Sequence, residues 1–131
     1  MYNKPNGYLR DAIITASPTS RLLMLLDRLT TDLKHAQLAF ESNNIELRNS
    51  ALIHAQEIVL SLRDSLRVDL WSGAEQLSRI YGFIYSELVF ANVNSDYDRF
   101  RLAEKLLSQI IDSWRNAAKK LETQGALVGL G

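Results

Sequence analysis

The sequence predicts an all-α protein. We expect an N-terminal arm over residues 1–16, an antiparallel up-down four-helix bundle over 17–123 and a flexible tail over 124–131. Leucine occupies 22 of the 131 positions, and leucine favours helix. Both prolines lie within the first 18 residues, so the rest of the chain lacks the residue that breaks helices most strongly. Apolar residues also recur at three- and four-residue spacing, which is typical of helices with one buried face.

The arm mixes turn-forming residues with a short apolar stretch, and we expect it to be extended or partly helical. Ser17 and Pro18 then mark the start of the first long helix. Serine is a good N-cap, and proline suits the first helical position. This helix should run to about Glu41, where the polar residues 42–44 supply a turn.

Short breaks separate the other three helices. The second helix is predicted over residues 45–71 and ends before a Ser-Gly pair. The third is predicted over 74–92, and the fourth over 96–123, with Ser95 or Asp96 as its N-cap. Helices of this length joined by short turns pack as antiparallel neighbours, which predicts the bundle.

Composition excludes several function classes. The 15 Lys and Arg residues balance the 15 Asp and Glu residues, which argues against a nucleic-acid binder that neutralises phosphates. The absence of cysteine excludes disulfides, thiolate metal sites and cysteine nucleophiles. The N-terminus has no apolar signal segment. The longest apolar run, residues 22–26, is far shorter than the roughly 18 residues of a membrane span. We therefore expect a cytoplasmic protein that binds no nucleic acid and inserts into no membrane.

No residue pattern indicates an enzyme. His35 and His54 have no His or Cys three or four residues away, and Asp32 is the nearest carboxylate to His35. Asp32 and His35 could form one edge of a metal pair, but surface or hydrogen-bonded histidines are the simpler interpretation. The chain also lacks the Glu-x-x-His pairs of di-iron bundles and any glycine-rich phosphate loop. We expect no catalytic residue, no metal and no cofactor.

The chain carries more large apolar residues than one buried face per helix requires. The predicted core faces include Leu26, Leu29, Leu52, Val59, Ile80, Tyr81, Ile84, Leu88, Phe100, Leu107 and Leu121. The residues left over are Met24, Leu38, Ile53, Leu60, Trp71, Phe83, Phe90, Leu102 and Leu106. Single exposed apolar residues are ordinary, whereas stripes of them are not. Either the buried faces are wide, or the stripes form a groove for a partner helix or for the arm.

Several short stretches occur together in a particular order. They are a tyrosine-bearing arm, Thr15-Ala16-Ser17-Pro18, a Leu- and Met-rich stretch ending at Asp27, Asn49, Ala55-Gln56-Glu57-Ile58, Leu77-x-x-Ile80-Tyr81-x-x-Ile84 and Trp114. This ordered set resembles the FliS family, the flagellin-specific export chaperones of bacterial flagellar secretion. The resemblance covers about Tyr8 to Ala117. Leu26 and Arg28 stand where the family usually has Tyr and Gly.

The resemblance implies a protein of the bacterial cytosol that binds the disordered C-terminal segment of flagellin. Such a protein prevents premature polymerisation and delivers flagellin to the flagellar export apparatus. The flagellin segment folds into helices against apolar surface of the bundle. In such chaperones the arm, with the family's tyrosine (here Tyr8), lies over part of that surface when flagellin is absent.

The surplus stripes and the resemblance together predict two sets of site residues. The flagellin contacts are predicted at Ile53, Leu60, Trp71, Phe83 and Phe90. The arm is predicted to dock through Tyr8, Leu9 and Ile13 on Met24 and Leu38. The alternative is a structural or self-associating bundle without a flagellin client, whose extra stripes pack against a second copy in a weak homodimer.

Overall fold

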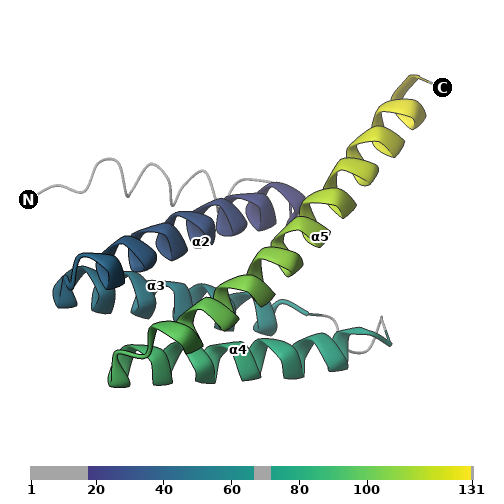
Figure 1. Ribbon diagram of the computed structural model, residues 1–131. Helices are drawn as coiled ribbons and strands as arrows, with labels where there is room; N and C mark the ends of the chain where they lie inside the picture. Colours follow the sequence, from purple (N-terminus) through teal and green to yellow (C-terminus); the bar gives the residue numbers. More distant parts are fainter. Residues whose placement is uncertain (1–17, 67–71, 131) are drawn as a thin grey trace, which may run out of the picture.

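Four α-helices form the described part of the chain. The computed structural model describes residues 18–66 and 72–130, with side chains as far as Thr123. The helices are α2 (Pro18–Glu41), α3 (Ile45–Asp64), α4 (Ala74–Asn94) and α5 (Tyr97–Leu130). Each helix packs against the next along the chain, and α5 returns to α2 (Figure 1). The predicted all-α class and four-helix bundle are therefore confirmed.

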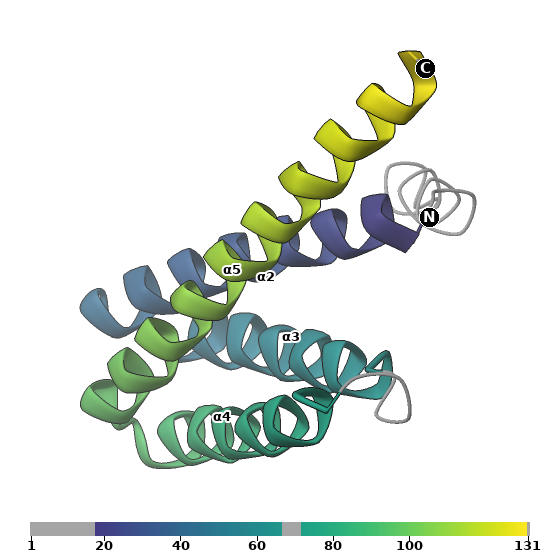
Figure 2. The same cartoon turned by 90° about the vertical axis from the view of Figure 1, so that its right-hand side faces the viewer.

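The fourth side of the bundle is its most open one. The contact between α2 and α5 is the least extensive of the four helix pairs, because α5 crosses α2 at an angle (Figure 2). The last turns of α5 extend beyond the other three helices in both views. Arg115 joins the two helices by donating to the Asp27 carboxylate at 2.9 Å and to the Thr30 hydroxyl at 3.3 Å.

Polar side chains fix the starts of α3 and α5. The Asn44 side chain accepts the backbone N–H three residues later at 3.0 Å, which caps α3. At the end of α4, Ser95 takes a left-handed conformation with φ of 51°. This turn lets the Asp96 N–H donate to the Ala91 carbonyl at 2.9 Å. The Asp96 carboxylate then accepts the N–H of Arg99 at 3.1 Å, so Asp96 is the cap of α5.

The predicted end of the second helix is wrong, because α3 ends at Asp64 rather than at Trp71. The Leu66 N–H donates to the Arg63 carbonyl at 3.1 Å, a tighter three-residue bond that closes the last turn. No glycine or proline marks this point, and leucines at helical spacing continue beyond it, so the sequence did not reveal the stop. Trp71 lies outside the described residues.

α2 ends at Glu41 as predicted, whereas α4 and α5 continue past their predicted ends. α4 reaches Asn94, two residues beyond the prediction. α5 continues to Leu130, through most of the expected tail. No proline removes a backbone donor after Thr123, so the hydrogen-bond ladder of the helix can continue there. The predicted arm, residues 1–16, lies outside the described residues.

The core lies between the four helices. The largest fully buried side chains are Tyr81, Phe100, Leu26, Leu29, Leu52, Ile84, Leu88, Leu107 and Val59. Each buried aliphatic or aromatic side chain of this size contributes about 1.5–3 kcal/mol relative to exposure. Two predicted core residues are instead exposed: Ile80 by 36% and Leu121 by 57%. Leu121 lies on the part of α5 that extends beyond the bundle, and Ile80 lies at the edge of the buried face of α4.

Tyr81 and Trp114 connect α4 with α5 inside the bundle. The Trp114 indole N–H donates to the Tyr81 hydroxyl at 2.8 Å. Burial raises the pKa of Tyr81 above its usual 10.0, and the hydrogen bond from Trp114 opposes that shift. The neutral phenol is therefore the form that the fold stabilises.

Replacing Tyr81 by phenylalanine should lower the free energy of unfolding by about 0.5–1.5 kcal/mol at neutral pH, because one buried hydrogen bond is lost. The pKa of Tyr81 is raised on folding. The contribution of the neutral phenol to the free energy of unfolding is therefore complete below pH 10.0 and is lost as pH rises through the folded pKa. The difference between wild type and variant in the free energy of unfolding in urea should therefore shrink as the pH rises above 10.0. A constant difference would show that the phenol titrates alike in both states.

Candidate functional site

One flank of α4 exposes two phenylalanines. Phe83 is 50% exposed and Phe90 is 39% exposed. They are seven residues apart, so they lie two turns apart on the same side of the helix, with Glu87 between them. On α5, Leu102 is 46% exposed and lies one turn after Arg99. We call these five residues the α4/α5 face.

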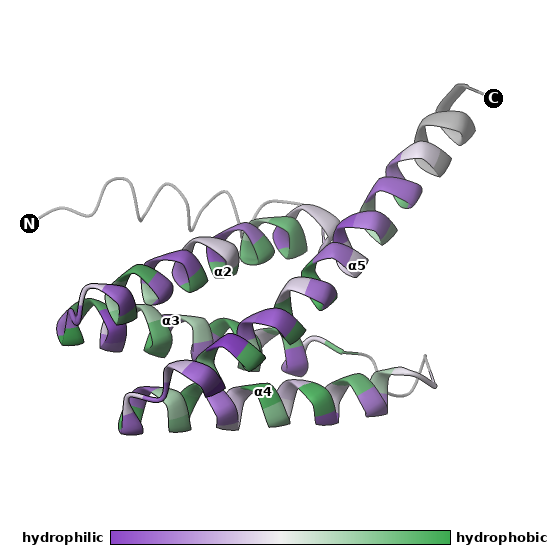
Figure 3. Cartoon of the chain, in the orientation of Figure 1, coloured by the Kyte–Doolittle hydropathy of each residue, from purple (hydrophilic) through white to green (hydrophobic). Residues whose placement is uncertain are grey.

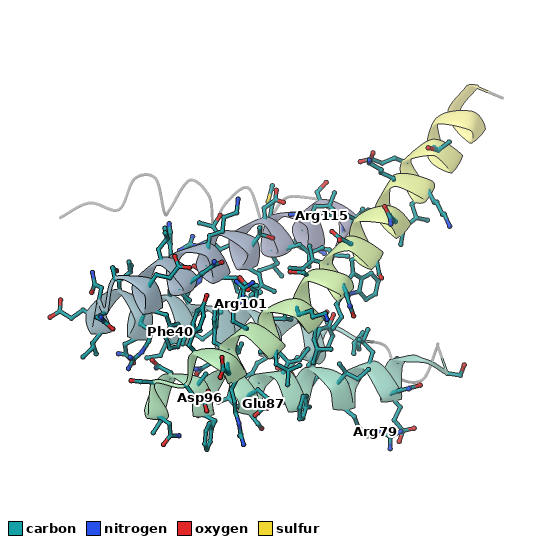
Figure 4. All side chains as sticks on the ribbon, in the orientation of Figure 1. Phe40, Arg79, Glu87, Asp96, Arg101 and Arg115 are labelled. Atoms are coloured by element: carbon teal, nitrogen blue, oxygen red, sulfur yellow. The ribbon has the colours of Figure 1, made fainter. Side chains whose placement is uncertain are left out.

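Arg99 joins the two helices across this face. Its guanidinium donates to the Glu87 carboxylate at 3.2 Å and lies over the Phe90 ring, 3.9 Å from the ring centroid. The Arg99 side chain is 47% exposed, but the Glu87 side chain is only 13% exposed. Figure 4 labels Glu87 and Asp96 at the end of the bundle where α4 turns into α5. The face is therefore apolar, with one ion pair that sits partly on an aromatic ring.

Figure 3 shows hydrophobic bands recurring along α4, whereas the front of α5 is mostly hydrophilic in the same view. The apolar part of the α4/α5 face is therefore built mainly by α4. Its polar groups come from both helices. An exposed surface of this kind can bind an amphipathic helix through its apolar side.

A different surface lies between α2 and α3. Two adjoining hollows of about 380 and 250 Å³ share Arg28, His54 and Glu57 in their linings. Asp32 lines the larger hollow, is 5% exposed, and is hydrogen-bonded to Nδ1 of His54. The Arg28 guanidinium lies 3.7 Å from the other carboxylate oxygen of Asp32. Asp32 is thus held from both helices, by Arg28 of α2 and by a hydrogen bond with His54 of α3.

Both histidines line the larger α2/α3 hollow. Asp32 pairs with His54 of the neighbouring helix, and His35 is an exposed lining residue of the larger hollow. In residues 18–66 and 72–123, no three side chains of His, Cys, Asp and Glu are arranged to hold a metal ion. These groups therefore act as a polar connection between α2 and α3.

The structure divides the predicted flagellin contacts between two flanks. It brings Phe83 and Phe90 together on the α4/α5 face. Ile53 is 43% exposed and lines the larger α2/α3 hollow, while Leu60 is half-buried on α3. The remaining predicted contact, Trp71, falls in the segment that the structure does not describe.

The predicted docking residues of the arm are also separated. Met24 lines the smaller α2/α3 hollow, together with Ile58 and Ser61. Leu38 lies about four turns further along α2 and is 57% exposed. Tyr8, Leu9 and Ile13 belong to the part of the chain that is not described.

The sequence did not reveal that Glu87 pairs with Arg99. Their spacing from Phe83 and Leu102 placed them on the same helix flanks, which was a usable signal. The sequence does not give the rotation of α4 relative to α5, and this rotation decides whether the charges of Glu87 and Arg99 meet. A charge at helical spacing between two surplus aromatic residues is therefore worth noting in such a sequence.

The comparison with known families decides what kind of protein carries this surface. The sequence model of the family described as flagellar protein FliS matches residues 1–121. The chain belongs to the FliS family. The predicted family resemblance is confirmed over nearly its whole length.

Three FliS relatives are each described as a flagellar secretion chaperone. The Bacillus subtilis protein is 28% identical over 115 residues, which is 88% of this chain and 86% of that protein. The Salmonella typhimurium protein is 29% identical over 120 residues, 88% of this chain and 87% of that protein. The Escherichia coli protein is 25% identical over 114 residues, covering 83% and 82% of the two chains. FliS proteins are chaperones rather than enzymes.

Three of the residues that suggested FliS hold the helices together. Asn49 of α3 accepts a hydrogen bond at 2.8 Å from the Asn92 amide of α4. Tyr81 and Trp114 form the bond between α4 and α5 described above. Leu26, at a position where FliS proteins usually have Tyr, is fully buried in the core. Among the described helices of this FliS protein, none is long and apolar enough to cross a bilayer.

Proposed function

We propose that this FliS protein binds the disordered C-terminal segment of flagellin in the bacterial cytosol. It keeps flagellin subunits from polymerising early and passes them to the flagellar export apparatus. The family match over residues 1–121 carries this proposal, since relatives of similar length are flagellar secretion chaperones. The exposed aromatic residues of the α4/α5 face supply a surface with suitable chemistry.

The α4/α5 face is the main contact in this proposal. Phe83 and Phe90 lie about 10 Å apart along α4, since a helix rises about 1.5 Å per residue. That distance matches the spacing of apolar residues two turns apart on a client helix. Ordering a disordered segment costs about 2–5 kcal/mol, so large apolar contacts are needed to offset it. Two phenylalanines, each contributing up to about 1.5–3 kcal/mol on burial, are of the right size.

The client contact continues onto α3 in this proposal. Ile53 and Leu60 expose apolar surface on that helix, and Trp71 follows it in the sequence. Ile53 lies in the α2/α3 hollow and not on the α4/α5 face, so one short helix cannot cover both surfaces. A client segment long enough to form more than one helix is therefore required.

The test is co-purification with flagellin of the same bacterium, either complete or without its last residues, about 40 in number. That length allows two or three helices of ordinary size. We expect a 1:1 complex with the complete flagellin and none with the truncated one. Size-exclusion chromatography of the chaperone alone should show a monomer. A concentration-stable homodimer that ignores flagellin would instead favour the self-associating bundle.

The arm is proposed to compete with the client for apolar surface. Deleting residues 1–16 should then tighten flagellin binding, by up to about tenfold if the arm covers the surface nine-tenths of the time. The deletion should also increase the fluorescence of a dye that binds exposed apolar surface. Isothermal titration calorimetry and dye titration measure the two effects. If neither changes, the arm does not compete.

A further inference from the structure

We propose that Arg99 selects for a client helix that carries a carboxylate next to its apolar anchor residues. This inference rests on the proposed function and concerns the chemistry of the bound segment. It starts from the position of the guanidinium, which lies between the Glu87 carboxylate at 3.2 Å and the Phe90 ring at 3.9 Å. A helix that covers Phe90 must therefore also meet Arg99.

Covering Arg99 removes water from its remaining donors. An arginine side chain has five N–H donors and no acceptor. Within residues 18–66 and 72–123, Glu87 is the one hydrogen-bond partner of the Arg99 guanidinium. Donors that lose water without gaining an acceptor weaken binding. A client that supplies an acceptor at this point avoids that cost.

Moving the Arg99 side chain away from the face does not remove the need for a second acceptor from the client. Glu87 is only 13% exposed, so its carboxylate depends on Arg99 for compensation. If Arg99 turned out to solvent, the client would cover an unpaired carboxylate. The favourable arrangement keeps Arg99 in place, shared between Glu87 and a second acceptor from the client.

A carboxylate is the acceptor that fits best. It matches the planar fork of a guanidinium and can accept two of its N–H groups at once. The Arg99–Glu87 pair is already neutral, so the preference for a carboxylate rests on this two-bond geometry and not on charge balance. On the client helix, this Asp or Glu should lie three or four residues from an apolar residue that contacts Phe90, because those spacings share one helix face.

Arg101 provides a matched control on the same helix. It pairs with Glu104 at 2.9 Å and lies 5.9 Å from the ring centroid of Tyr97, so it too combines an ion pair with an aromatic ring. Tyr97 packs against Phe40 of α2, with ring centroids 5.4 Å apart. Arg101 therefore belongs to the flank of α5 that faces Phe40 (Figure 4), and it is two residues, about 200° around the helix, from Arg99.

The experiment is a double-mutant cycle with the complete chaperone and the C-terminal segment of flagellin from the same bacterium. The dissociation constant is measured by calorimetry for wild type, Arg99→Gln and Arg101→Gln. The flagellin segment is used unchanged and with each Asp or Glu replaced singly by its amide. Thermal unfolding of each chaperone variant shows whether the fold is retained.

We expect Arg99→Gln to weaken binding by about tenfold or more, and Arg101→Gln by less than about threefold. One carboxylate substitution in flagellin should cause a similar loss with wild-type chaperone and little further loss with Arg99→Gln. Lysine at position 99 should recover part of the affinity, because charge returns without the planar fork.

The outcomes separate this inference from the proposed function. If wild type binds the segment but the effects of Arg99→Gln and of every carboxylate substitution simply add, the inference is overturned and the proposed function stands. If wild type does not bind the segment at all, the proposed function fails and the inference fails with it. Equal losses for Arg99→Gln and Arg101→Gln would also count against a specific role of Arg99.

Discussion

Replacing Phe83 and Phe90 together by serine should weaken binding of the flagellin segment by about 10- to 100-fold. Burying a fully exposed phenylalanine contributes about 1.5–3 kcal/mol, and these two rings are 50% and 39% exposed before binding, so the pair contributes about 1.3–2.7 kcal/mol. A loss of 1.4 kcal/mol is about a tenfold change in affinity, which sets the expected range. Calorimetric titration of wild type and the double variant measures the effect.

The fold should survive this double substitution. Phe83 and Phe90 are 50% and 39% exposed, so serine leaves the core packing intact. The helical circular dichroism spectrum should therefore be kept, while the free energy of unfolding falls by about 1–3 kcal/mol, since each half-exposed ring contributes about 0.5–1.5 kcal/mol. The calorimetric titration then reports binding by a folded chaperone.

Two other exposed apolar residues serve as the matched control. Ile45 is 65% exposed and Leu121 is 57% exposed, at the start of α3 and near the end of α5. Their replacement by serine removes a comparable kind of surface outside the α4/α5 face. We expect affinity within about threefold of wild type for this pair, a change below about 1 kcal/mol. Similar losses in both double variants would mean that general surface hydrophobicity, rather than the α4/α5 face, drives binding.

The helices and most of the core could be predicted from the sequence because they depend on spacing within one helix. Leu26, Tyr81 and Phe100 were assigned to core faces by periodicity alone, and all three are buried. The same periodicity left Phe83 and Phe90 outside the core, and both are exposed. Spacing within a helix therefore separated the buried face from the surplus stripe on α4.

Relations between helices could not be predicted in the same way. The pairs Asp32–His54 and Glu87–Arg99 each join two helices, and nothing within a single helix fixes their register. The early end of α3 had a similar cause. The tighter turn at Leu66 comes from the local backbone path, which residue type alone did not indicate.

The separation of Ile53 from Phe83 was missed for the same reason. Both were surplus apolar residues on neighbouring helices, so a single continuous groove was the simplest expectation. The rotation of α3 places Ile53 in the polar α2/α3 hollow instead. The proposed client surface is thus better described as the α4/α5 face with separate contacts on α3.

Replacing Phe100 by alanine should cause the largest loss of stability among the single substitutions considered. Phe100 is fully buried in the second turn of α5, and its ring centroid is 5.2 Å from that of Phe40 and 6.2 Å from that of Tyr97. Removing such a ring leaves a cavity and costs about 3–5 kcal/mol. For a domain with about 5–15 kcal/mol of total stability, this is a large fraction. Urea unfolding followed by circular dichroism measures the change in the free energy of unfolding.

Phe90→Ala is the comparison that gives this result its meaning. The Phe90 ring is 39% exposed and carries Arg99 on one side, so its removal should cost only about 0.5–1.5 kcal/mol. If Phe90→Ala destabilises the free chaperone as much as Phe100→Ala, Phe90 belongs to the core. Its burial by a client would then contribute little to binding. We expect Phe100→Ala to lower stability far more than Phe90→Ala, and Phe90→Ala to lower flagellin affinity more than Phe100→Ala. The reason is the helical spacing, which places Phe100 in the interior and Phe90 on the proposed partner surface.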